Sequence, residues 1–196
     1  MDTSLLTAHL FGVALLFVMI SIELVALYGA PRATSVGQLR AALYAGPAIE
    51  RIAPVATLLI AGTGLWMVAR MSWIGFGDAW VVLAIVVTLA LAVVGNVVQG
   101  RRLAAIGRVA GTALDGEVPA ELAELTRDPV LHTAGWGSTG AAFAFLWLMV
   151  DQPGAIGAIL AFVVGPAIGI AIGQVLLSRA ATPAIADSGR AGASAS

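Results

Sequence analysis

The sequence of 196 residues contains no cysteine and no lysine, since all of its basic side chains are arginines. The missing cysteine excludes disulfide bonds, zinc–thiolate sites, iron–sulfur clusters and thiol nucleophiles. The missing lysine excludes Schiff-base chemistry and a lysine-containing phosphate loop. Charge is scarce as well: 11% of the residues are charged, against about 25% in soluble domains. A net charge of −1 gives no basic surface for nucleic acid.

Apolar side chains, by contrast, are abundant: they make up 60% of the chain, and the mean hydropathy is +0.98. This composition excludes an ordinary soluble enzyme and a disordered chain. A helix that crosses a bilayer needs about 20 mostly apolar residues, and in lipid only helices and closed barrels satisfy the backbone. The alternating segments typical of barrels are missing. We therefore expect an all-α polytopic membrane bundle with five transmembrane helices, at about residues 5–28, 52–70, 79–100, 130–150 and 154–178.

The segments between these spans predict two short helices. One is expected near residues 36–45, ended by Gly46-Pro47, and the other near residues 119–126. The third span should continue as a helix beyond the membrane. Residues 1–180 then form one transmembrane domain, and the Ala/Gly/Ser-rich residues 181–196 are expected to be a disordered cytoplasmic tail.

The arginines predict the orientation of the bundle. With five spans the connecting segments alternate between the two sides, and every arginine except Arg70 falls on one side. Because arginine-rich loops stay in the cytoplasm, we expect the N-terminus outside and the C-terminus inside the cell, in the inner (plasma) membrane.

Small residues recur every four positions along the fifth predicted span. Small residues allow close helix packing in lipid, where the hydrophobic drive between helices is weak. Two interpretations stay open: the fifth span packs on the fourth as an antiparallel hairpin, or it joins a second copy in a homodimer or another membrane-complex partner. The residues of this stripe are Gly157, Ala161, Gly165, Gly169 and Gly173.

Four polar side chains are predicted at similar depth, near the cytoplasmic ends of their spans: Glu23, Asn96, Gln99 and His132. Ionisable groups inside a bilayer are costly and often functional. One hypothesis is an inner-leaflet polar cluster that forms a proton-linked or cation site. The others are a purely structural hydrogen-bond cluster between helices, or a Glu23 side chain that reaches water.

His9 is predicted near the outer end of the first span, where Met67 and Met149 are expected as well. An imidazole with thioethers suits Cu(I), or supplies axial ligands for haem b. The alternative is an interfacial histidine beside methionines that only fill space. A haem held by both histidines is not expected, because His132 lies near the opposite face of the membrane.

Three segments resemble a family of uncharacterised bacterial integral membrane proteins: Ala8-His9-Leu10-Phe11-Gly12, residues 59–65 and residues 145–153. The resemblance covers roughly residues 5–153 and implies no activity. A fainter likeness, carried by His9 near the outer start of the first helix, is to copper-resistance membrane proteins and to haem-carrying membrane protoporphyrinogen oxidases.

No set of catalytic residues stands out in the sequence. We therefore expect a non-enzymatic protein, either an accessory subunit or a small transport-related bundle. The alternative is a haem- or copper-binding membrane redox protein that uses His9.

Overall fold

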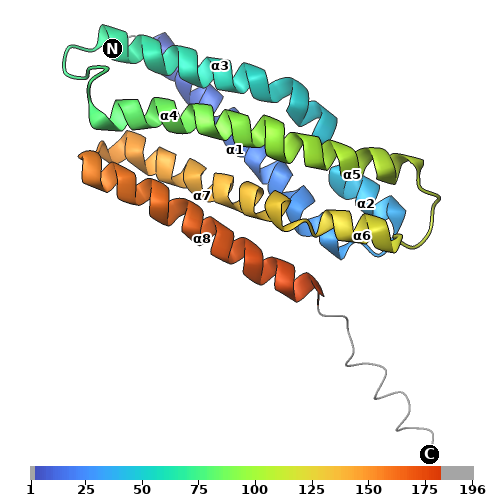
Figure 1. The fold of residues 1–196 in the computed structure, drawn as a ribbon. Coiled ribbons are helices and arrows are strands. Elements are labelled where there is room, and N and C mark those ends of the chain that lie inside the picture. Colours follow the sequence, from blue (N-terminus) through green and yellow to red (C-terminus); the bar gives the residue numbers. More distant parts are fainter. Residues whose placement is uncertain (1–2, 182–196) are drawn as a thin grey trace, which may run out of the picture.

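The computed structural model describes residues 3–181. Within this range the chain consists of helices and short connections (Figure 1). The expected tail at 181–196 lies outside the described residues, apart from Ala181 at the end of the last helix. In chain order the elements are α1 (Thr3–Gly29), η1 (Ala30–Arg32), α2 (Val36–Leu43), α3 (Gly46–Arg70), α4 (Ala79–Val93), η2 (Val94–Gly100), α5 (Arg101–Thr112), α6 (Ala120–Thr126), α7 (Pro129–Asp151) and α8 (Ala155–Ala181).

Four helical segments are long and apolar enough to cross a membrane: Thr3–Arg32, Arg51–Arg70, Ala79–Thr112 and Ala155–Ala180. The third is one continuous rod of α4, η2 and α5, so the predicted extension of the helix beyond residue 100 is confirmed. An all-α membrane bundle is thus supported.

Helix α7, the remaining predicted span, has 23 residues but is less apolar, since it carries glycines, hydroxyl side chains and a histidine. It also buries many residues against neighbouring helices. A helix covered by protein needs less apolar surface than one that faces lipid, which explains the difference in composition.

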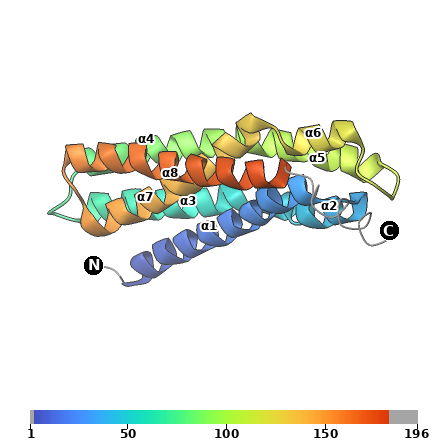
Figure 2. The same ribbon diagram turned by 90° about the horizontal axis from the view of Figure 1, so that it is seen from below.

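The long helices lie side by side and alternate in direction (Figures 1 and 2). Helices α7 and α8 form one closely packed antiparallel pair, and α1 and α3 form another. The rod of α4, η2 and α5 contacts α7 and α8, whereas α3 makes few contacts with α4. At the end opposite to Thr3, Arg32 donates a hydrogen bond to the Leu176 carbonyl (2.6 Å), which ties α8 to η1.

The small-residue stripe of α8 is the surface on which α7 packs. A Cβ built at Gly165 would lie 2.7 Å from the Gly140 carbonyl oxygen, and one at Gly169 would lie 2.1 Å from that of Trp136. Gly173 lies against the Trp136 ring. The hairpin interpretation is therefore confirmed for this face, and a second copy would have to displace α7 to use it.

The two other stripe positions lie nearer the start of α8. A Cβ at Gly157 would meet the Pro153 ring at 2.9 Å, within the turn that precedes the helix. Ala161 is half-buried. Of the five predicted positions, the contacts with α7 therefore confirm three, Gly165, Gly169 and Gly173.

Short helices α2, α5 and α6 form a cap at the end of the bundle that holds η1. The cap has its own apolar core, to which α1 and α7 also contribute. The buried side chains of this core are Leu27, Ala30, Leu39, Ile106, Ala110, Leu122 and Leu131. Both short helices predicted from the sequence are thus confirmed, at Val36–Leu43 and Ala120–Thr126.

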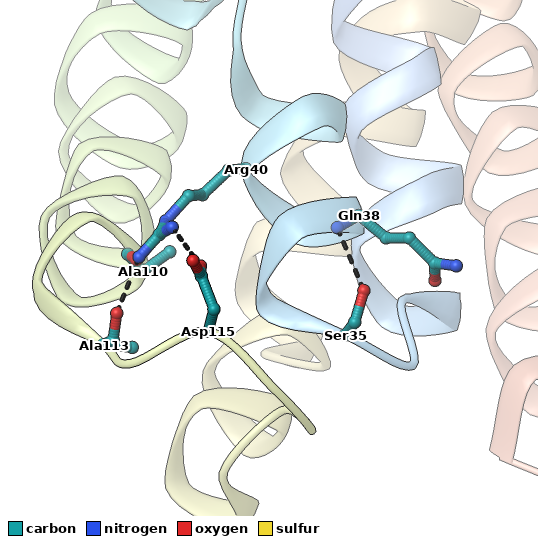
Figure 3. A network of polar contacts seen from close by, with 6 residues as sticks. All are labelled: Ser35, Gln38, Arg40, Ala110, Ala113 and Asp115. Carbon is teal, nitrogen blue, oxygen red and sulfur yellow. Dashed lines mark hydrogen bonds and ion pairs between the residues drawn. The ribbon is translucent and has the colours of Figure 1, made fainter.

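Polar contacts join α2 to the end of α5 (Figure 3). Arg40 donates to the carbonyls of Ala110 (2.8 Å) and Ala113 (2.6 Å) and pairs with Asp115 (2.6 Å). These carbonyls end a helix and lack intrahelical donors, so a guanidinium satisfies them well. At the other end of α2, the Ser35 hydroxyl caps the helix by accepting from the backbone N–H of Gln38 (3.3 Å).

The first short helix was expected to reach residue 45 and to be broken by Gly46-Pro47, and it ends just before this dipeptide, at Leu43. The dipeptide itself begins the next helix, α3. Proline is well tolerated in the first turn of a helix, where its missing N–H would have had no partner.

Candidate functional site

A cavity of about 860 Å³ lies between α1, α3, the α4–η2–α5 rod and α7, and it reaches α2 in the cap. Most of its wall is apolar and includes Leu16, Met19, Ile60 and Phe145. The cavity is not enclosed. Its polar lining consists of Glu23, Thr57, Thr88, Asn96, Gln99 and Ser138, together with Arg40, Arg101 and Arg108 near the cap.

Glu23 projects from α1 into this cavity. Its Oε1 atom is buried and has no hydrogen-bond partner among the described residues. Buried polar atoms nearly always have a partner, and an unpaired buried carboxyl is particularly costly. Such an atom in a cavity wall indicates a place where a ligand group or water completes the hydrogen bond.

Two amides reach the same cavity from η2, which is a π-helical segment. The Asn96 NH2 group donates to the Ala92 carbonyl (2.7 Å), and that of Gln99 donates to the Ser138 hydroxyl on α7 (3.1 Å). No described residue donates to either amide oxygen. Wide π turns in otherwise regular helices are frequent at functional sites.

The sequence gives a physical reason for the wide turn but no specific signal. Between Val94 and Gly100 the segment holds β-branched valines and glycines, which both weaken the regular α-helix. A Cβ at Gly100 would lie only 3.3 Å from the Gly95 carbonyl oxygen, so the turn itself favours glycine there.

His132 was predicted to join Glu23, Asn96 and Gln99, but the structure does not place it in the cavity wall. Its Nε2 donates to the Thr126 carbonyl (2.9 Å), and its Nδ1 is buried without a partner in the described chain. The predicted Glu23–His132 pair is therefore not formed. The turn between α6 and α7 draws the imidazole toward the cap, an effect that helix depth alone does not reveal.

His9 is 6% exposed and contacts α3 through a short polar chain. The Thr63 hydroxyl donates to the Leu59 carbonyl (2.5 Å), so at 2.9 Å from His9 Nδ1 it acts as the acceptor. His9 thus carries its proton on Nδ1, and its Nε2 keeps a free lone pair. Sequence reasoning missed Thr63 as the partner, because hydroxyls that bond to their own helix are common in spans.

The predicted methionines are not joined to His9 by any described contact. Met67 lines a separate small pocket with Leu5, Trp66 and Arg70, and Met149 is half-buried on α7. Among residues 3–181 no group of three or more histidine and acidic side chains is placed to hold a metal ion. His9 alone therefore offers one nitrogen, which is fewer ligands than a closed metal centre needs.

No family model matches this chain, and no match is found among curated proteins or solved structures. The resemblance to uncharacterised bacterial membrane proteins stays a prediction.

Proposed function

We propose that this protein crosses the inner membrane five times, with its N-terminus outside and its C-terminus in the cytoplasm. Four helices have the length and apolar character of spans. Helix α7 has a similar length and packs along α8 in the opposite direction. The arginines support the orientation: in the described chain all except Arg70 lie at or near the end of the bundle that holds the cap.

Single cysteines test this topology, because the chain has none of its own. Gly77 and Gly154 are suitable positions, since no described atom lies within 4 Å of a Cβ built at either one. In intact cells we expect a membrane-impermeant maleimide to label Gly77→Cys and Gly154→Cys but not Leu114→Cys in the exposed cap loop. If Gly77→Cys is labelled and Gly154→Cys is not, α7 does not cross and the five-span proposal fails.

We further propose that the protein is a small transport-related bundle that binds a mainly apolar ligand in the cavity. One observation carries this proposal: a largely apolar cavity of about 860 Å³ holds the buried, unpartnered carboxyl oxygen of Glu23. Ligand sites are typically apolar hollows of about 300–1,000 Å³ with a few polar groups that orient the ligand.

Binding of radiolabelled dodecanol and dodecylamine to the full-length protein in phosphatidylcholine nanodiscs tests this function, with empty discs as background. Ala92 lines the cavity, whereas Ala90 on the same helix is exposed and does not line it. We expect at least one of the two probes to bind saturably. Ala92→Phe should abolish this binding, and Ala90→Phe should preserve it. No saturable binding of either probe would refute the proposal and favour a non-enzymatic accessory subunit.

His9 supports a second candidate, a haem- or copper-binding redox protein. The observation in its favour is the imidazole whose Nδ1 is held by Thr63 and whose Nε2 lone pair is free. Histidine ligands usually have their other nitrogen held in this way. An absorption spectrum and copper analysis of protein purified from replete cells test the candidate. If the protein shows no Soret band and holds no copper, this candidate is refuted. If a signal is present and is lost in His9→Ala but not in His132→Ala, the candidate is supported.

A further inference from the structure

We propose that the ligand of this cavity is an amphiphilic amine, whose ammonium group is bound by Glu23 and by the amide oxygens of Asn96 and Gln99. This inference rests on the proposed function, because it names the class of ligand that the same cavity takes.

The first step is the polarity of the groups that face the cavity. Each of the two amide NH2 groups already donates within the protein, whereas the oxygens of Asn96 and Gln99 accept from no described residue. Glu23 adds a carboxyl oxygen without a partner. The hydroxyls of Thr57 and Ser138, which also line the cavity, can either donate or accept. The groups at this site that can only accept, the two amide oxygens and Glu23 Oε1, therefore suit a ligand rich in hydrogen-bond donors.

The second step is that no basic side chain of the described protein neutralises Glu23. Arg40 lines the cavity, but its guanidinium is engaged by two carbonyls and Asp115 in the cap. Arg101 and Arg108 line it too, yet both are exposed. A cationic ligand group beside Glu23 would supply the missing charge, and hydrogen bonds to the amide oxygens would satisfy its remaining protons.

The third step distinguishes an amine on an apolar chain from a hydrated inorganic cation. Most of the wall beyond Glu23 is apolar and satisfies no hydration shell. An alkyl chain fills that space favourably, since burial of each methylene contributes about 0.8 kcal/mol.

The fourth step is a route of entry. Asn96 lines the cavity and is exposed, and the cavity is not enclosed. Helix α3 makes few contacts with α4, so helix packing does not seal the side between them. In the proposed topology this opening lies in the inner leaflet, where amphiphilic amines partition with their head group at the interface.

Glu23→Gln tests the assignment, because it keeps the size of the side chain and removes its charge. The matched control is Glu117→Gln, which changes an exposed carboxylate in the cap loop. With the nanodisc assay and the same two probes, we expect the wild type to bind dodecylamine more tightly than dodecanol. Glu23→Gln should weaken dodecylamine binding about 30-fold or more, change dodecanol binding less than about twofold, and leave the folded state intact by circular dichroism. Glu117→Gln should change neither.

The outcomes separate this inference from the proposed function. If dodecanol and dodecylamine bind equally and Glu23→Gln changes neither, while Ala92→Phe abolishes both, the cavity binds apolar chains and the amine inference is wrong. If neither probe binds saturably, the proposed function itself fails. If Glu23→Gln does not fold, Asn96→Leu is used in its place. An Asn96→Leu variant that still prefers dodecylamine over dodecanol as strongly as the wild type would overturn the role of the Asn96 amide oxygen.

Discussion

The contact between α7 and α8 gives a sharp prediction about Gly140. A Cβ at this position would lie 2.0 Å from the Gly165 carbonyl oxygen, and an ordinary contact needs about 3.4 Å, so Gly140→Ala requires a separation of about 1.4 Å. Both groups belong to helix backbones, so no side chain can rotate away. A gap of even 0.5–1 Å loses about a quarter to a half of the dispersion energy of each facing contact.

A matched control isolates this packing effect from helix propensity. Gly62 lies inside α3, and no described atom from outside its own part of the helix lies within 4 Å of its built Cβ. Gly62→Ala should be neutral or stabilising by up to about 1 kcal/mol, because alanine is the better helix former. Gly140→Ala gains the same propensity but overpacks the interface, which costs about 1–3 kcal/mol or more. We therefore expect the two variants to differ by about 2 kcal/mol.

Reversible unfolding by sodium dodecyl sulfate in mixed micelles measures this difference. Tryptophan fluorescence is a suitable signal, since the Trp136 ring lies directly against Gly173 in the same interface. Equal stability of Gly140→Ala and Gly62→Ala would refute the reasoning, because the backbones of α7 and α8 would then not be in close contact.

The cap contacts give three smaller predictions. Arg40→Met removes charged donors from the carbonyls of Ala110 and Ala113, and should lower the free energy of unfolding by about 2 kcal/mol. Asp115→Asn should lower it by less than about 1 kcal/mol, because this carboxylate is 85% exposed and exposed ion pairs contribute little. Ser35→Ala removes a helix N-cap, with an expected loss of about 1 kcal/mol. The same unfolding assay checks all three, and equal losses for Arg40→Met and Asp115→Asn would argue against the carbonyl contacts.

Composition and the order of polar and apolar residues determined the class of this protein. Long uncharged stretches predict helices because a backbone in lipid has to satisfy its own hydrogen bonds. The four-residue spacing of small residues likewise located the face of α8 that packs on α7, at Gly165, Gly169 and Gly173. These are local properties of one segment, so the sequence carries them directly.

Only the tertiary structure decided which polar groups meet. Glu23, Asn96 and Gln99 line one cavity, whereas His132 at similar predicted depth bonds to the Thr126 carbonyl instead. Depth along a helix follows from sequence position, but the direction in which a side chain points depends on how each helix is rotated against its neighbours. That rotation results from packing between segments far apart in the chain, as does the contact between His9 and Thr63.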